Sequence, residues 1–403
     1  MDLSVTFCDI KLKNPLIAGS ADNSRSLSQF RKLAEAGLAA VVLKSLTDVE
    51  ALQNRNMARF RCLNGNLRAW KTGEDKGAFY SRGGSMLSVG EWKASLTEIE
   101  PIAADHGVAL IGNICASRQE NWRAFALMME DAGLPAIELN LGNPHYGASD
   151  KPLGARIAQS EELLADIIGT ACSSVSIPVI AKLSPQVSDI VRLSKIAAAA
   201  GAAALTVAHR FQGFMIDIEN REPISKHLYG YGGPWLVPIA LGYVYKIASE
   251  FSIPVCGSGG VRRWEDVMQF IMAGASTVQM TSSLMLETPE IVPDILFGIR
   301  EFLKKHDDQC LQNLVGSALG KAGCDDRMPD EARLFVRDPS ACRQCARKPC
   351  IDACFFDAVT RTSDGAVEIS NTCTACGLCR QFCPFEDVLE LSTAPSEEGR
   401  KLK

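Results

Sequence analysis

Residues 178–210 read PVIAKLSPQVSDIVRLSKIAAAAGAAALTVAHR and contain one complete strand–helix–strand unit. The two flanking runs, 178–184 and 204–210, are nearly continuous in apolar residues, as parallel strands buried on both faces are. The segment between them, 188–200, has helical periodicity and ends at Gly201, a residue typical of helix ends. The stretch therefore predicts a βαβ unit within a parallel sheet.

The same alternation of strand and helix continues through the first 305 residues. Six further apolar runs bring the predicted strands to eight: 14–20, 38–45, 108–114, 135–141, 254–260 and 276–282. Besides 188–200, helical patterns lie at 27–36, 92–105, 119–132, 160–173, 237–250, 264–273 and 289–304. Eight evenly spaced units are typical of a (β/α)8 TIM barrel, an α/β fold, whereas the alternative, a doubly wound open sheet, would not require eight. The segment 4–13 predicts a small hairpin ahead of the first strand.

The composition excludes several classes of protein. Of the 403 residues, 47% are hydrophobic and 22% are charged, which is the balance of a soluble globular protein. A formal net charge of −5 gives no electrostatic reason to expect nucleic acid as a partner. The N-terminus lacks the basic start and apolar core of a signal peptide, and the longest apolar stretches are too short to span a membrane. We therefore expect a cytoplasmic protein.

Eight of the fifteen cysteines are concentrated between residues 342 and 383. The run CTACGLCRQFCP (373–384) has the C-x2-C-x2-C-x3-C-P spacing of bacterial ferredoxins, in which the fourth cysteine usually ligates the other cluster. The run CRQCARKPCIDAC (342–354) has two extra residues between its second and third cysteines, and Phe355 replaces the proline. Two structural zinc sites are the alternative. We expect one 4Fe-4S cluster on Cys373, Cys376, Cys379 and Cys354, and another on Cys342, Cys345, Cys350 and Cys383.

These patterns divide the chain into three predicted parts. They are a barrel at 1–305, a helical linker at 306–335, and a ferredoxin-like α+β domain with two 4Fe-4S clusters at 336–403. Within the last part, 366–370 reads as a short strand preceded by a turn at 360–365. A module this small is stabilised by its metal sites more than by a hydrophobic core.

In a (β/α)8 barrel the active site lies at the carboxyl ends of the strands. Two long excursions, 46–91 and 211–236, leave from this face, and long loops of this kind usually cover or build a site. The residues at the predicted strand ends include Gly19, Ser20, Lys44, Asn113, Asn140, Lys182, His209, Arg210, Thr281 and Ser282.

These residues at the strand ends predict a site for a phosphate and a flavin ring. The glycine turn CGSGGV (256–261) follows the seventh predicted strand and precedes a helix, an arrangement that cradles phosphate with backbone N–H groups. Lys44 and Lys182 end two strands, and paired cations there would stabilise an electron-rich flavin ring. The sequence offers no acid beside Lys182, which argues against a lysine in a surface ion pair.

Several segments between residues 14 and 283 carry a family resemblance: NPLIAGS, VVLKS, ELNLxxPH, IPVIAKLSP, YGGPWLVPIAL, CGSGGV and ASTVQMTSS. The chain resembles the FMN-dependent dihydroorotate dehydrogenases, and most of all the barrel and two-cluster ferredoxin module of the dihydropyrimidine dehydrogenase type. The resemblance implies a substrate-facing Asn140. It also implies FMN contacts at Ala18, Gly19, Lys44, Lys182, Gly233, Gly259, Gly260, Thr281 and Ser282.

The resemblance also implies how electrons move. FMN would exchange hydride with an activated C–C bond of a small-molecule substrate, and the clusters would transfer electrons to or from the flavin. No GxGxxG motif opens a βαβ unit in this chain, so direct binding of NAD(P)H is not expected. We expect a separate FAD/NAD(P)-binding subunit or a soluble ferredoxin as the electron partner. By analogy with the family, the chain is expected to form a homo-oligomer.

Two positions depart from the family pattern. After the fourth strand the family has Asn-Leu-Ser-Cys-Pro or a serine variant, in which cysteine or serine is the acid/base. This chain has Gly142 and Asn143 there, and an amide cannot act as a general acid or base near neutral pH. On the sixth strand, a Thr-Asn-Thr segment that binds the pyrimidine ring is replaced by Ala208, His209 and Arg210.

Three hypotheses follow from these departures. In the favoured one, His145, Tyr146 or His209 has become the proton donor, and Arg210 binds an anionic, non-pyrimidine substrate. In the second, Asn143 only orients the substrate, and water or the substrate supplies the proton. In the third, the barrel is an electron-transfer or scaffold subunit, which the retained polar mouth argues against. A basic run in the first excursion would add to an anion-binding lid: Arg55, Arg59, Arg61, Arg68 and Lys71.

Overall fold

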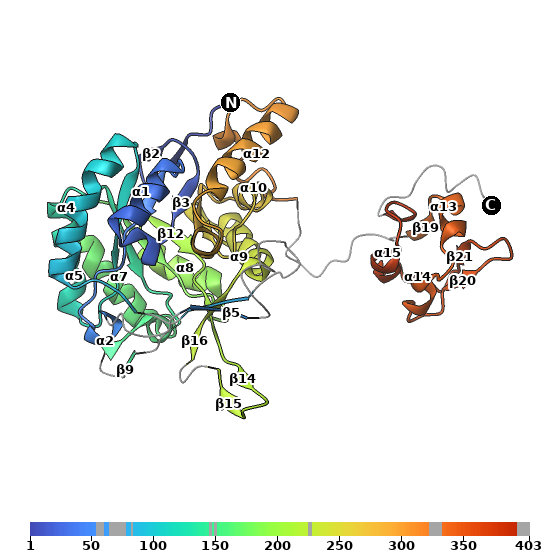
Figure 1. The fold of residues 1–403 in the computed structure, drawn as a ribbon, viewed down its shortest axis with the longest axis horizontal. Helices are drawn as coiled ribbons and strands as arrows, with labels where there is room; N and C mark the ends of the chain where they lie inside the picture. Colours follow the sequence, from blue (N-terminus) through green and yellow to red (C-terminus); the bar gives the residue numbers. More distant parts are fainter. Residues whose placement is uncertain are drawn as a thin grey trace. The chain divides into compact units, whose positions relative to one another are not determined.

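The computed structural model describes residues 1–53, 60–63, 78–81, 84–144, 147–148, 151–224, 228–321 and 333–392. The chain divides into two compact units, Met1–Ala322 and Gly323–Lys403, which Figure 1 shows coloured along the sequence. Among the described residues, no helix is both long and apolar enough to cross a membrane.

The first unit is built on a closed barrel of eight parallel strands, so the predicted (β/α)8 barrel is confirmed. The strands follow one another round the barrel in chain order, and the last pairs with the first, with Val278 opposite Leu16. Each coincides with one of the eight predicted apolar runs. They are β3 (Leu16–Ala18), β4 (Ala40–Val42), β7 (Ala109–Ile114), β8 (Ala136–Asn140), β11 (Val179–Lys182), β12 (Ala204–Val207), β17 (Val255–Ser258) and β18 (Thr277–Met280).

Helices surround this barrel at the predicted positions (Figure 1). Local sequence explains their ends: Ser88 and Glu91 form a reciprocal capping box at the start of α4, and Asp189 caps α8. Gly201, just beyond α8, has a φ of +103°, which glycine adopts without strain. The helices are α1 (Leu27–Glu35), α4 (Val89–Asp105), α5 (Gln119–Asp131), α7 (Glu161–Ser174), α8 (Ile190–Ala199), α9 (Val237–Glu250), α10 (Trp264–Met272) and α12 (Ile291–Lys305).

The predicted N-terminal hairpin is also present. Strand β1 (Val5–Phe7) pairs antiparallel with β2 (Ile10–Leu12), and Phe7 is buried in the barrel core. This segment seals the core rather than contributing to the site.

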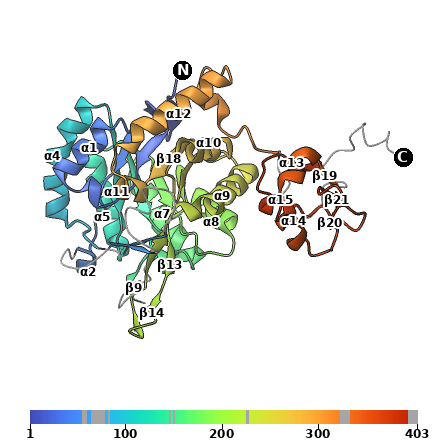
Figure 2. The same cartoon turned by 45° about the vertical axis from the view of Figure 1, so that its right-hand side comes forward.

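The two excursions meet in one sheet. Strand β16 (Tyr229–Gly232), from the second excursion, pairs with β6 (Ala78–Ser81), from the first. Two further strands, β13 (Phe211–Gly213) and β5 (Phe60–Leu63), complete a four-stranded sheet. A hairpin of β14 (Ile216–Asp217) and β15 (Glu222–Pro223) extends away from the barrel in Figures 1 and 2. Segments about 150 residues apart in the sequence therefore build one cover over the barrel mouth.

The second unit has its own small core. The predicted strand at 366–370 is present as β21 (Val367–Ile369), and it pairs with β20 (Val359–Arg361). The predicted turn at 360–365 was therefore wrong at its first two residues, which belong to β20. Strand β19 (Arg333–Val336) pairs with β22 (Leu389–Ser392). Three short helices each carry a buried cysteine: α13 (Pro339–Gln344), α14 (Pro349–Asp352) and α15 (Leu378–Phe382). The core mixes these cysteines with a few aliphatic side chains, which is little apolar material for a separate unit.

Candidate active site

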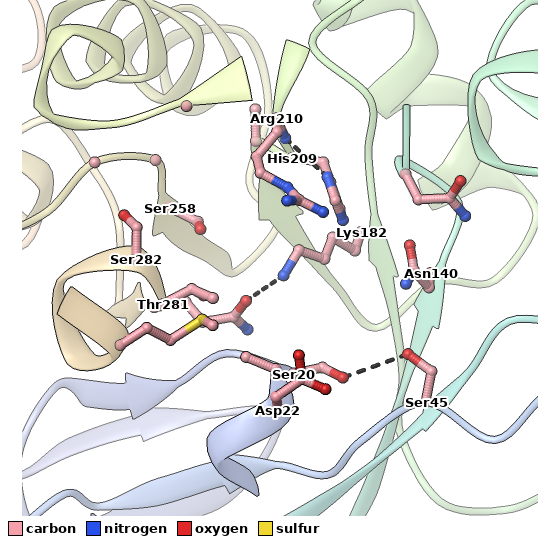
Figure 3. A pocket seen from close by; sticks show the side chains of 18 of the residues that line it. Ser20, Asp22, Ser45, Asn140, Lys182, His209, Arg210, Ser258, Thr281 and Ser282 are labelled. Carbon is pink, nitrogen blue, oxygen red and sulfur yellow. Dashed lines mark hydrogen bonds between the residues drawn. The ribbon is translucent and has the colours of Figure 1, made fainter. Parts of the chain in front are cut away.

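A pocket of about 1030 Å³ lies at the carboxyl ends of the barrel strands (Figure 3). The excursion sheet contributes Phe60 and Gly232 to its wall. Ala18 and Gly19 are buried behind this lining, with Gly19 packed against Thr281 so closely that a Cβ would lie 2.2 Å from Oγ1. The sequence-predicted residues that line the pocket are Lys44, Asn140, Asn143, Lys182, His209, Arg210, Gly233, Gly259, Gly260, Thr281 and Ser282.

A polar network inside the barrel holds Lys182. Its Nζ lies 3.6 Å from Glu138 Oε1 and donates to Gln279 Oε1. The Glu138 side chain is buried, and its carboxylate accepts from Asn113 Nδ2 at 3.0 Å, Thr206 Oγ1 at 2.8 Å and Gln279 Nε2 at 2.8 Å. Donors from four other strands therefore satisfy this carboxylate. The acid partner that the sequence around Lys182 lacks comes from the neighbouring strand.

Lys44 has an acid partner as well. Its Nζ lies 3.3 Å from Asp22 Oδ1, and Ser85 Oγ donates to the same oxygen at 2.6 Å. Lys44 and Asp22 both line the pocket. Both predicted lysines are thus held in place by carboxylates, Lys182 by the buried Glu138 and Lys44 by Asp22 in the pocket lining.

Replacing Glu138 by glutamine is expected to lower the free energy of unfolding by about 3 kcal/mol, because the Lys182 ammonium then stays buried without its carboxylate. Thr206→Val is the matched control, because it removes one hydrogen bond to the same carboxylate but keeps the charge of Glu138. We expect it to lower the free energy of unfolding by about 1 kcal/mol. Urea unfolding of both variants measures the difference. Equal losses would mean that the charge of Glu138 contributes nothing beyond its hydrogen bonds.

Three glycines bring two loops together on one side of the pocket. Gly233 has a φ of +137°, Gly259 of +123° and Gly260 of +79°. A Cβ on Gly260 would lie 2.1 Å from the carbonyl oxygen of Gly233, so only glycine permits this approach. Helix α11 (Ser282–Leu286) starts beside this turn at Thr281. A close backbone turn next to a helix start fits a phosphate group.

The turn after β8 presents two amides to the pocket. Asn140 is buried, and within the described residues its Oδ1 has no hydrogen-bond partner, so this acceptor is available to a ligand. Asn143 is also buried, and its Nδ2 donates to Cys115 Sγ at 3.5 Å. Burial, and to a smaller extent Asp48, raises the pKa of Cys115 to about 12, so this thiol is not a base near neutral pH. A Cβ on Gly142 would lie 2.5 Å from the Leu183 carbonyl oxygen, which explains the glycine before Asn143.

The turn after β12 carries an imidazole and a guanidinium. His209 Nδ1 accepts from the Arg210 backbone N–H at 2.8 Å, so a neutral imidazole here carries its proton on Nε2. The guanidinium packs on β16, where a Cβ on Gly230 would lie 2.8 Å from its Cζ. Burial lowers the pKa of Arg210 to about 10, against the opposing effect of Asp22, and the group remains a cation at neutral pH. Figure 3 shows His209 and Arg210 beside each other at the pocket.

Part of the predicted site lies outside the described residues. This applies to His145 and Tyr146, two of the proposed proton donors, and to the basic lid residues Arg55, Arg59, Arg68 and Lys71. The side chain of Arg61 is likewise not described.

The pocket residues that the sequence did not single out include three with polar side chains: Asp22, Ser45 and Gln279. Asp22 and Ser45 follow the ends of the first two barrel strands, so their position was the signal that could have identified them. Gln279 lies within β18, where only the alternation of inward-facing residues gives a hint. Its contacts with Lys182 and Glu138 exist only because the barrel closes.

Six of the eight cysteines in the two runs lie in the core of the second unit or pack against it, whereas Cys376 is exposed. Cys354, Cys373, Cys376 and Cys379 line one hollow of about 290 Å³. Burial raises the pKa of Cys350 to about 11, and the nearby thiols of Cys342 and Cys383 contribute to the rise. In the part of the chain that the structure describes, no three His, Cys, Asp or Glu side chains form a group that could hold a metal ion.

Comparison with known proteins identifies the family. The family model described as dihydroorotate dehydrogenase matches residues 2–303. The chain belongs to the dihydroorotate dehydrogenase family. It is 30% identical over 326 residues to the catalytic subunit of dihydroorotate dehydrogenase B (NAD(+)) from Thermoplasma volcanium, and 32% identical over 320 residues to that from Pyrococcus abyssi. Each alignment covers 79% of this chain and 99% of the relative.

Membership of this family confirms the predicted resemblance to the FMN-dependent dihydroorotate dehydrogenases. The chain is an oxidoreductase of the kind that acts on CH–CH donors, and the family implies FMN as its cofactor. The match to the family model ends at residue 303, whereas the cysteine-rich unit begins at Gly323. The second unit is therefore additional to the part that defines the family.

Proposed function

We propose that this chain is an FMN- and iron–sulfur-dependent oxidoreductase that transfers hydride between FMN and the activated C–C bond of an anionic, non-pyrimidine substrate. The observation that carries the proposal is the wall formed by His209 and Arg210, where the family resemblance places a pyrimidine-binding segment. The Arg210 guanidinium is half-buried. Such a group favours a carboxylate or another planar anion, which it binds with paired hydrogen bonds.

The residues of the pocket fit FMN. The glycine turn at Gly259 and Gly260, next to Ser282, suits the phosphate, and Lys182 lies on the pocket floor where an electron-rich ring would rest. When bound, FMN supplies hydride chemistry and connects two-electron with one-electron transfer. The Glu138 carboxylate, 3.6 Å from Lys182 Nζ, would keep that ammonium in place for the ring.

The chain's own residues then bind the substrate and hold the proton. Arg210 binds the anionic group of the substrate. The Oδ1 of Asn140, which has no partner among the described residues, accepts a hydrogen bond from an N–H or O–H elsewhere on the substrate. The proton on His209 Nε2 is the one delivered to the carbon next to the hydride carbon. Asn143 orients the substrate but does not titrate, because an amide neither gains nor loses a proton near neutral pH.

The cysteines of the second unit suit two 4Fe-4S clusters. Four thiols, three of them from the run 373–379, line one hollow. The spacing of that run is typical of a cubane cluster rather than of the paired ligands of a zinc site. Cys350 lies near Cys342 and Cys383, and also near Cys379 of the other proposed set, so the thiols of the two runs lie close together. Clusters here would pass electrons between FMN and a partner, either a soluble ferredoxin or an FAD/NAD(P)-binding subunit. The names of the relatives, which describe a catalytic subunit of an NAD(+) enzyme, favour a separate subunit.

The test is anaerobic photoreduction of the bound flavin, followed by reoxidation with unsaturated carboxylates, uracil, thymine, orotate and one-electron carriers. We expect an unsaturated carboxylate to reoxidise the flavin at least about 100-fold faster than any of the three pyrimidines. Comparable rates with a pyrimidine would contradict the proposal. Reoxidation by the electron carriers alone would instead favour an electron-transfer or scaffold subunit.

A further inference from the structure

The two extra residues in the first cysteine run place a buried lysine beside the cysteines. Lys348 is 2% exposed, in a unit whose other lysines and arginines lie mostly at the surface. It precedes α14 with φ and ψ of +52° and +55°, a left-handed conformation that is strained for a residue with a Cβ. A favourable interaction of the Lys348 side chain must therefore offset both the backbone strain and the burial of its charge.

The two halves of the unit show what is unusual about this lysine. Gly377 precedes α15, two residues before Cys379, and has a φ of +75°. Lys348 occupies the matching place before α14, two residues before Cys350. Glycine adopts this conformation without strain, so the second run has the expected residue and the first does not.

The contacts of Lys348 surround its ammonium with carbonyl oxygens. Nζ donates to the Cys342 carbonyl at 2.5 Å and to the Cys345 carbonyl, and the backbone N–H donates to Cys345 Sγ at 3.3 Å. Carbonyl dipoles solvate the charge but do not neutralise it. Among the described residues, Lys348 forms no ion pair with a carboxylate. The protein part of the site therefore supplies no negative side chain to balance the charge of this ammonium.

We infer that Lys348 is the internal counter-ion of the cluster proposed on Cys342, Cys345, Cys350 and Cys383, and that it raises the reduction potential of that cluster above that of its neighbour. The inference rests on the proposed function. A cluster held by four thiolates is an anion that becomes more negative on reduction, and a buried cation stabilises the reduced form more. Hydrogen bonds to sulfur do not favour this set of cysteines. In the described residues it receives one, whereas the other set receives two, from Ala358 N–H to Cys354 Sγ at 3.3 Å and from Ala375 N–H to Cys373 Sγ at 3.4 Å.

Two substitutions remove the charge in different ways. Lys348→Met keeps most of the side-chain volume, and Lys348→Gly also relieves the backbone strain and copies Gly377, so at least one should fold. Lys348→Arg is the matched control that keeps the charge. The measurement is an EPR-monitored redox titration of the full-length chain with assembled clusters, together with its iron and sulfide content.

We expect the methionine and glycine variants to shift one cluster to lower potential while the other stays unchanged. At the wild-type midpoint the ratio of oxidised to reduced cluster should rise at least about tenfold, which corresponds to 59 mV for one electron. Loss of one cluster from these two variants, with both kept by the arginine variant, would also support the counter-ion role. Unchanged potentials, or equal loss in all three variants, would overturn it.

Two different results would overturn the role of Lys348, and only one of them would also overturn the proposed function. Wild-type protein, purified without oxygen, that lacks the broad visible absorption and the EPR signals of 4Fe-4S clusters would overturn the proposed function and this role with it. Two assembled clusters with potentials insensitive to Lys348 would leave the proposed function standing and overturn the inference alone.

Discussion

Replacement of His209 by alanine is expected to lower turnover at least about 100-fold, because general acid catalysis by a positioned side chain typically contributes a factor of that size or more. Arg210→Ala should cause a loss of similar size, since it removes the cation that binds the anionic group and leaves its negative charge unpaired. Asn143→Ser should reduce turnover less than about tenfold, because Asn143 only orients the substrate. The measurement is the rate at which the best acceptor from the oxidant panel reoxidises the photoreduced flavin.

Two controls make this comparison decisive. His106→Ala changes a histidine at the end of α4, far in sequence from the pocket lining, and should leave the rate unchanged. The FMN content of every variant is measured alongside, so that lost chemistry is not confused with lost cofactor. If Asn143→Ser proves the most damaging of the substitutions, the proton donor has not moved to His209.

Gly260→Ala is expected to weaken FMN binding at least about tenfold. The added Cβ would lie 2.1 Å from the Gly233 carbonyl oxygen in a residue with a φ of +79°, so the two loops must separate. Backbone strain of this kind costs about 1–3 kcal/mol, and each 1.4 kcal/mol is a factor of ten in affinity. The separation would also move the N–H groups that face the phosphate.

Gly242→Ala is the matched control for this substitution. Gly242 lies within α9, and no atom lies within 4 Å of the Cβ that alanine would add. Alanine there should leave FMN binding unchanged and stabilise the helix by about 0.5–1 kcal/mol. Equilibrium dialysis measures the dissociation constant of FMN, and thermal unfolding checks that both variants fold. An unaltered dissociation constant for Gly260→Ala would remove this turn from the phosphate site.

Much of the fold could be predicted because its determinants are local. Each barrel strand is buried on both faces and must therefore be apolar along its length, which makes all eight visible in the sequence. Serine, aspartate and glycine at helix ends act within a single turn, as at Ser88 and Gly201. The cysteine runs are local as well, and their spacing is the basis of the proposed clusters.

The site could be predicted only in part. Position at a strand end was enough to find Lys44, Lys182, Asn140 and His209, because a barrel places every strand end at one mouth. The partners of these residues could not be found in this way. Glu138, the partner of Lys182, lies within β8 rather than at its end, and the packing of Arg210 on Gly230 joins the end of the sixth barrel strand to the second excursion.

The sequence by itself determined the barrel, the glycine turn, the cysteine spacing and the departures at Asn143 and His209, because each depends on residues a few positions apart. Tertiary structure alone decided how the charges are paired. Glu138 contacts Gln279, 141 residues later, only because the barrel closes, and β6 meets β16 only because both excursions fold over one mouth. Buried charges are stable only with partners, and closure of the fold, rather than neighbouring sequence, supplies them.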